Sequence, residues 1–518
     1  NNWKYRFAGI RVISNYVAIT TRIPEAGQLE QHRNDISATL IAYTSDIHPR
    51  VRSAAFFGLA MFVSYHGNNM REDEIDSIIQ ILLTSLSIGN NPSPRVRRDI
   101  LLALVAALDV APAKGVERWA GMLLGHVSSA LQDGPVIVQE QCISVIVSLV
   151  ESIDSHVLAN YYSSLMPVMQ GLLTYAHQNG LISLWGNTLV CSAMVGEASG
   201  KNIFRDDASI LMNVLIDLQN ETDESNDING YLLKAFVCIA RCLNEEFVPF
   251  LRPVIERILR TIIYNVKQTE QELGEDDIDE IENQSDMEIM ETNNGGLIAV
   301  RTSAVEELAC ACQLIKLLTE KMQAQVYPFV EQIINNITPL FQSPHEDVRC
   351  YAIMCAPELV RATAIAAAIA NINKDTSIST TILSEVSTYI LGLLVAWLST
   401  ESVIEIMIIG IKAVTSIISH SSTNWAQIYN ESIDPIKMGL NPTNSIPILA
   451  VDQILAISSC AQSIFNESIQ RRAVRRAEKA IASQLQNNNG NGNADADDDV
   501  DGDGDGDGDG DEADDEQN

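Results

Sequence analysis

A short motif recurs along this chain at a spacing of just over 40 residues. Val51, Val96 and Val138 occupy the same place in successive copies and are separated by 45 and 42 residues. A period of this length is that of a repeat protein in which each unit is one pair of antiparallel helices. Four segments carry the motif: His48–Leu59, Ser93–Leu104, Gly134–Ile143 and His345–Ala352.

The residues around each valine suit the second helix of such a pair. Proline precedes the valine in the first turn, where its missing N–H is not needed. The valine is expected to point inward, and the small residues that follow allow close packing. The arginine directly after the valine is expected to pair with acidic or carbonyl groups of the neighbouring repeat. We therefore predict an all-α solenoid of HEAT-type repeats, an open right-handed superhelix with no β-sheet.

Apolar residues at helical spacing fill the stretches between the motifs, as in Ile75, Ile78, Ile79, Leu82, Leu83 and Leu86. Trp3–Thr20 is predicted to be the second helix of a repeat whose first helix is absent. About ten repeats fit the chain. Further first helices are predicted near 114–131, 156–175, 245–264 and 323–342. Further second helices are predicted near 181–198, 228–244, 297–320, 345–365, 401–419 and 443–485.

The acidic residues are concentrated in two segments. Of a formal net charge of −33, 14 acidic residues lie between Asp495 and Glu516 and 11 between Glu270 and Glu291, with no basic residue in either. Such charge repels nucleic acid and anionic membranes and favours basic partners. We predict four regions: repeats over 1–267, an acidic mobile loop over 268–295, further repeats over 296–486, and a disordered Asn/Asp/Gly tail over 487–518. A basic face precedes the tail on the last helix, formed by Arg471, Arg472, Arg475, Arg476 and Lys479.

Targeting and redox features point to the cytosol or nucleus. Polar residues interrupt the apolar stretches, so no membrane span is expected, and no secretory signal follows Asn1. A start at asparagine suggests a fragment. The nine cysteines form no CxxC pair and sit in apolar helical context, which indicates reduced core thiols in preference to disulfides or metal ligands.

Further blocks follow one another in a fixed order along the chain: Trp3–Gly9, His48–Ala55, Phe204–Ser209, Glu246–Leu251, the acidic loop at 270–291 and Thr302–Leu314. In this order they resemble the karyopherin-β (importin β) family of nuclear transport receptors, within its importin beta-3 branch. The similarity covers residues 1 to about 365 well and the remainder loosely. Two departures matter, because the family's N-terminal repeats, which supply its principal Ran-GTP site, and its C-terminal repeats have no counterpart here.

The resemblance implies a monomeric, non-enzymatic cargo carrier that shuttles between cytoplasm and nucleus. Basic import signals, such as those of ribosomal proteins and histones, would lie along the concave face, to be released by Ran-GTP. Phe-Gly nucleoporins would bind apolar slots on the outer face, and neither nucleic acid nor membrane is an expected partner. Candidate cargo-binding side chains at second-helix positions are Asp99, Glu140, Glu151, Asp154, Asn187 and Glu197.

Two alternatives remain at the level of sequence. Each candidate side chain can be an ordinary solvated helix residue or part of a salt bridge between repeats. The chain can also be another HEAT scaffold, such as a phosphatase regulatory subunit or a condensin-type protein. GxxxxGK[ST], GxSxG and HExxH motifs are absent, so no catalytic residues, cofactor or metal are predicted. The Asp-Gly run at 501–510 lacks the glutamate and bulky apolar residue of a calcium loop.

Overall fold

The computed structural model describes residues 2–20, 32–87, 93–221, 228–268, 287–291, 297–372, 380–401, 403–422 and scattered positions between 457 and 470. The chain divides into two units, residues 1–457 and 458–518, and the architecture below is that of the first unit. The predicted tail over 487–518, the basic face at 471–479 and the helix near 443–485 lie outside the described residues, apart from isolated positions of that helix.

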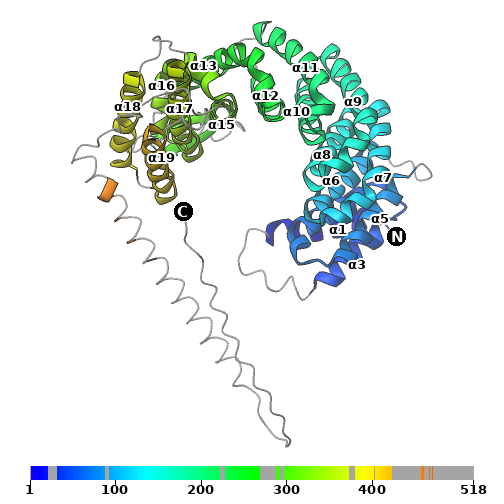
Figure 1. The fold of residues 1–518 in the computed structure, drawn as a ribbon. Coiled ribbons are helices and arrows are strands. Elements are labelled where there is room, and N and C mark those ends of the chain that lie inside the picture. The colour runs from blue at the N-terminus through cyan, green and yellow to red at the C-terminus, as the bar shows by residue number, and fades with distance from the viewer. Residues whose placement is uncertain are drawn as a thin grey trace, which may run out of the picture. The chain divides into compact units, whose positions relative to one another are not determined.

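The first unit is a stack of helix pairs in which each helix contacts its partner and its neighbours in the next pair. This confirms the predicted all-α HEAT-repeat solenoid. Figure 1 shows α8, α10, α12 and α15 on the inner side of a curved row. The first helices of the pairs are α3 (Arg33–Tyr43), α5 (Glu72–Leu86), α7 (Ala113–Asp133), α9 (Ser155–Gln178), α11 (Lys201–Glu221), α13 (Leu251–Gln268), α16 (Val330–Ile337) and α18 (Thr380–Leu398). The second helices are α4 (Pro49–His66), α6 (Pro94–Val110), α8 (Val136–Ser152), α10 (Ile182–Ser199), α12 (Asn229–Leu243), α15 (Thr302–Met322), α17 (Glu346–Ile372) and α19 (Ile404–Ser422).

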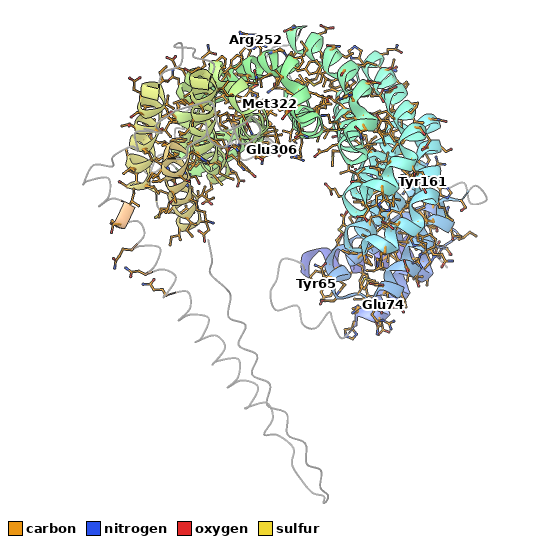
Figure 2. All side chains as sticks on the ribbon, viewed as in Figure 1. Tyr65, Glu74, Tyr161, Arg252, Glu306 and Met322 are labelled. Atoms are coloured by element: carbon orange, nitrogen blue, oxygen red, sulfur yellow. The ribbon has the colours of Figure 1, made fainter. Side chains whose placement is uncertain are left out.

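The second helices form one continuous inner row, in which α4 packs on α6, α6 on α8, and so on to α19. As predicted, α1 (Trp3–Thr20) belongs to this row, because it packs against α4. In Figure 2 the side chain of Glu306, on α15, lies at the inner edge of the curve, whereas Arg252, on α13, lies at the outer edge. The inner row is therefore one surface to which successive repeats each contribute a strip of side chains.

The motif residues act as the sequence predicts at the start of each second helix. Pro49 and Pro94 open α4 and α6, and Val51, Val96 and Val138 are all at most 1% exposed. The buried valines therefore anchor the first turns of α4, α6 and α8 in the core.

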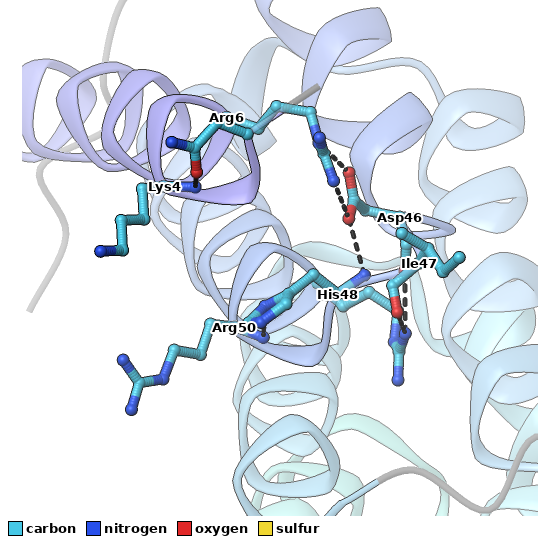
Figure 3. Close-up of polar contacts among 8 residues, drawn as sticks. Lys4, Arg6, Asp46, Ile47, His48 and Arg50 are labelled. Carbon is cyan, nitrogen blue, oxygen red and sulfur yellow. Dashed lines mark hydrogen bonds and ion pairs between the residues drawn. The ribbon is translucent and has the colours of Figure 1, made fainter.

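The arginine after the valine differs in part from expectation. Arg52 donates from Nη1 to the carbonyl of Asp46 at 2.8 Å, which lies in its own repeat. The Asp46 carboxylate in turn accepts from Arg6 of α1 at 2.6 Å and from the backbone N–H of His48 at 2.7 Å (Figure 3). Among the motif arginines that the structure describes, only Arg349 both donates to a carbonyl of its own repeat and forms an ion pair with the following one. Its partner there is Glu401, at 2.9 Å. The contact between repeats is thus made near Arg52 by Arg6 and Asp46.

A two-stranded hairpin interrupts the helices between α13 and α15. Strand β1 (Met287–Glu291) pairs antiparallel with β2 (Leu297–Arg301), with Ile289 opposite Ala299. The prediction of no β-sheet is therefore wrong at this one place, and β1 falls inside the segment expected to be a loop. Alternation of Met287, Ile289 and the acidic residues between them is a strand pattern that the high charge of the segment obscured. Because β2 occupies Leu297–Arg301, the helix predicted from 297 begins at Thr302.

The first helix predicted over 323–342 is broken into three pieces. A 3₁₀ helix, η3 (Gln323–Phe329), leads into α16, and a second, η4 (Thr338–Gln342), follows it. Pro328 and Pro339 remove backbone donors at the two joints, which favours the tighter turns. A similar 3₁₀ helix, η2 (Asn244–Phe250), precedes α13 and contains Pro249.

Two helices are long and apolar enough to cross a membrane, contrary to the expectation from sequence. They cover Glu346–Ala370, with a mean hydropathy of 1.6, and Ile404–Ser421, with a mean hydropathy of 1.4. The apolar window of the first is 78% buried, as expected for a core helix that packs between α15 and α19. The small residues from Ala362 to Ala370 that raise its hydropathy serve this packing, which is why composition alone gives weak evidence for a membrane span.

Candidate functional site

The exposed strip of the inner row changes character along the chain. The exposed or half-buried side chains near the starts of its helices include Arg50, Arg95 and Arg98 on α4 and α6, and Glu140 and Asn187 on α8 and α10. These positions are therefore basic at α4 and α6 and acidic or neutral at α8 and α10. The six candidate side chains differ in exposure and in whether they already pair with another residue of the chain.

Glu140 and Asn187 have the placement expected of ligand-binding side chains. Glu140 is half-buried on α8, and Asn187 is exposed on α10, the next helix of the inner row. Neither side chain makes a hydrogen bond or ion pair with any residue that the structure describes. Their polar groups therefore remain open to an incoming peptide.

Glu197 is already paired. Its carboxylate accepts from Nη1 of Arg241, on α12, at 3.0 Å, and its side chain is 23% exposed. The same carboxylate lies near Cys238, where burial of the thiol, the main cause, and the carboxylate together raise the cysteine pKa to about 12. Glu197 thus links α10 to α12 and matches the alternative of a salt bridge between repeats.

Asp99 is buried, with an exposure of 1%. It accepts from Nε of Arg98 at 2.9 Å and from the hydroxyl of Ser53. Because both oxygens are occupied and the side chain is shielded from solvent, Asp99 serves to hold α4 against α6.

Glu151 and Asp154 lie near the turn between α8 and α9. Both are exposed, and Asp154 directly precedes α9. The ligand atoms of Asp154, His156 and Glu117 all lie within 4.8 Å of one another. Exposed carboxylates often gather in this way without a metal, so the cluster does not identify a metal site.

An arginine-rich pocket of about 380 Å³ lies between α1, α4 and α6. Sequence reasoning missed it, although the run Arg95, Arg97, Arg98 and the repeated arginine at Arg50 were visible, because the resemblance pointed to carboxylates. Its arginines and aromatic residues are Arg11, Arg50, Arg95, Arg98, Phe7 and Phe57.

A second pocket, of about 570 Å³, lies where α7 and α8 meet α9. Leu131 and Gln139 line one side, and Val168, Leu172 and Tyr175 of α9 line the other. Tyr175 is 47% exposed. This is a shallow, mainly apolar site with contributions from two successive first helices.

The cysteines behave as the sequence predicts. All eight that the structure describes are free thiols, and all but Cys350 are buried. Burial raises the pKa of Cys142 to about 12 and that of Cys310 to about 11, so both stay protonated and unreactive near neutrality.

The fold defines the class: an α-solenoid of HEAT-type helix pairs. No family model matches the chain. It is 25% identical over 339 residues to importin subunit beta-3 of Saccharomyces cerevisiae, covering 65% of this chain and 30% of that protein. It is also 25% identical over 259 residues to a probable importin-5 homolog of Dictyostelium discoideum, covering 50% of this chain and 22% of the relative.

Solved structures agree with the fold. Kap121p bound to Ste12p has a TM-score of 0.69 at 21% identity and covers 91% of this chain and 41% of its own. Kap121p bound to Nup53p has a TM-score of 0.68 at 21% identity, covering 92% and 41%. The similarity to the karyopherin-β family, within its importin beta-3 branch, is thus confirmed. The chain spans less than a third of the length of the curated relatives that it matches.

Proposed function

We propose that this chain is the repeat region of a nuclear transport receptor, a non-enzymatic carrier that moves between cytoplasm and nucleus. The observation that carries the proposal is the match to importin subunit beta-3 over 339 residues. The continuous inner row of second helices offers a surface for partners. Kap121p has been solved with Ste12p and with Nup53p, so the related protein binds both kinds of partner that the proposal requires here. Ran-GTP would control release of the cargo.

Basic import signals are proposed to bind the inner row across α8 and α10. Glu140 supplies a carboxylate for a lysine, and Asn187, on the next helix, can hold the peptide backbone by accepting and donating hydrogen bonds. Glu151 and Asp154 extend the acidic surface at one end. Glu197 and Asp99, which are paired within the protein, support the helices that present this surface and do not contact the cargo.

The test is a charge reversal of the open inner-row positions. The double variant Glu140→Lys with Asn187→Lys should weaken binding of a lysine-rich import peptide about tenfold or more, since a partly desolvated ion pair contributes about 1–2 kcal/mol. Affinity for the parent chain should also fall as salt rises. Fluorescence anisotropy with a labelled peptide measures both effects.

Asp217→Lys with Asn213→Lys, both exposed on α11, provides the matched control, since it changes the net charge by the same amount. Because α11 is a first helix, neither substitution touches the inner row. If this control weakens binding as much as the double variant does, or if the double variant binds the peptide as the parent does, the inner-row assignment is wrong.

The pocket at α7 and α9 is proposed to receive a phenylalanine of a Phe-Gly nucleoporin. Val168 and Leu172 offer an apolar wall, and the exposed Tyr175 can stack on an aromatic ring. Val168→Asp should abolish retention of the chain on immobilised Phe-Gly repeats while leaving import-peptide affinity unchanged. Retention equal to that of the parent would exclude this pocket.

A further inference from the structure

The arginine pocket between α1, α4 and α6 has a chemistry opposite to that required for basic cargo. Four guanidinium groups, from Arg11, Arg50, Arg95 and Arg98, line a volume of about 380 Å³. In a chain with a formal net charge of −33, this pocket is a local concentration of positive charge, which favours an anionic ligand.

The one carboxylate that lines the pocket compensates only one of these charges. Asp99 is occupied by Arg98 at 2.9 Å and by Ser53. Arg11 lies over the ring of Phe57, 5.0 Å from its centroid, and Arg50 lies 5.5 Å from the ring centroid of Trp3. Cation–π contacts of this kind orient a guanidinium without neutralising it.

The remaining arginine, Arg95, is exposed and makes no ion pair within the described residues. Arg50 and Arg95 open α4 and α6, two adjacent helices of the inner row, so both guanidinium groups border the same pocket. The forked geometry of a guanidinium matches a carboxylate in a two-point contact. Three uncompensated arginines therefore surround a site that fits more than one acidic group.

The lining also contains apolar surface. Phe7 and Phe57 are half-buried at the pocket, beside the small side chain of Ala54. A ligand that carries carboxylates as well as an aromatic or aliphatic side chain would contact both the arginines and the apolar surface. The basic surface does not continue onto α8, where the strip carries Glu140, so a long polyanion such as nucleic acid has no basic track to follow.

We propose that this pocket binds a short acidic peptide segment of a partner protein, with its carboxylates between Arg11, Arg50 and Arg95 and an apolar side chain against Phe7 and Phe57. This site is distinct from the proposed one for basic signals on α8 and α10. The solenoid would then hold two segments of opposite charge on neighbouring repeats.

The experiment uses the full chain and a fluorescein-labelled eight-residue peptide of Asp and Glu with one central Phe. Anisotropy titration should show binding that weakens with salt, and Arg50→Gln with Arg95→Gln should weaken it at least about tenfold. Both arginines are exposed, so their removal leaves no buried charge unpaired. Arg98 is left intact because it neutralises the buried Asp99.

The matched control is Arg97→Gln, compared with the single variant Arg95→Gln. Each removes one positive charge from α6, and of the two residues Arg95 lines the pocket. Arg97→Gln should leave affinity within about twofold of the parent. Equal loss in these two single variants would overturn the proposal, because the effect would then be one of net charge alone. Binding of the peptide to the double variant as tightly as to the parent would also overturn it.

Two further measurements separate the proposal from its rivals. A lysine-rich import peptide should bind the Arg50/Arg95 double variant at least as well as the parent, so failure of the basic-cargo site and failure of this pocket are distinguishable. A variant with the 14 acidic residues between Asp495 and Glu516 replaced by Asn or Gln should bind the acidic probe like the parent. A several-fold gain in affinity for the acidic probe would contradict the proposal, because it would show that the chain's own tail occupies the pocket.

Discussion

Arg349, at the start of α17, illustrates how a single motif residue serves different purposes in different repeats. Its Nη1 donates to the carbonyl of Ser343 at 2.8 Å, as Arg52 does to the carbonyl of Asp46 in an earlier copy. Gln139 occupies the same position in α8 and donates to the end of α7, also at 2.8 Å. The shared role is to close the turn between the helices of one pair, and a side-chain amide performs it as well as a guanidinium.

Arg349 has a second role that Arg52 lacks, since it pairs with Glu401 at 2.9 Å, with side-chain exposures of only 10% and 4%. Arg349→Met should therefore lower the free energy of unfolding by about 3–5 kcal/mol, because it removes the guanidinium that neutralises the buried Glu401 carboxylate. Arg52→Met should lower it by about 1–2 kcal/mol, the typical effect of losing hydrogen bonds to carbonyls. Urea denaturation followed by circular dichroism measures both. Equal losses of stability in the two variants would show that the ion pair with Glu401 adds nothing to the hydrogen bonds that close the turn.

Close approach between helices depends on glycine at particular places. In α10, a Cβ on Gly196 would lie 2.5 Å from the ring of Phe204, which is 1% exposed at the start of α11. Gly125, in α7, has no atom within 4 Å of the corresponding position. The two residues occupy helices of similar length, yet only one of them sets a distance between helices.

Gly196→Ala should destabilise the chain by about 1–3 kcal/mol, because the buried Phe204 ring must move to admit a methyl group. Gly125→Ala should instead stabilise it by about 0.5–1 kcal/mol, as expected at an exposed helix position. Thermal or urea midpoints distinguish the two signs. A stabilising Gly196→Ala would mean that α10 and α11 pack less tightly than described.

Across the whole first unit, ion pairs join repeats that are neighbours in the stack. Glu246 in η2 illustrates the pattern, since it accepts from Nε of Arg205 at 2.6 Å and from Lys201 at 2.8 Å, both on α11. These two hydrogen bonds lower the pKa of Glu246 from its ordinary value of 4.5 to about 2. Other pairs between neighbouring repeats are Arg6–Asp46, Arg33–Glu74, Arg118–Asp76 and Arg241–Glu197.

The lowered pKa of Glu246 makes a pH-dependent contribution to stability. A carboxylate whose pKa is lower in the folded chain stabilises it fully above the unfolded value of 4.5, and loses this effect as pH falls toward 2. Glu246→Gln should therefore lower the urea midpoint at pH 7, and the difference from the parent should shrink between pH 4.5 and pH 2. Glu256→Gln is the control, since Arg252 is 3.8 Å away. A constant difference across this pH range would contradict the assignment.

Periodicity was sufficient to predict most of the second helices that the structure describes, because inward valines and prolines in the first turn are local signals. The predicted helix over 181–198 matches α10 to within one residue at each end. The hairpin at β1 and β2 and the 3₁₀ breaks beside α16 were missed, since a short strand inside an acidic segment and a broken helix give weak periodic signals.

The candidate site, too, could be predicted only in part. Glu140 and Asn187 could be placed on the inner row from the repeat alone. That Asp99 is buried and Glu197 is paired depends on residues 46 and 44 positions away, Ser53 and Arg241, whose side-chain directions no repeat period specifies. The arginine pocket likewise combines residues of three helices.

The continuous inner row also has a mechanical consequence. Each second helix packs on the one before and the one after, so the described repeats are elastic elements connected in series. In a series, the compliances of the interfaces add, and a small rotation at each interface sums to a large change in curvature. An extended ligand that touches several repeats can thus set the pitch of the solenoid by doing only slight work on any one helix pair.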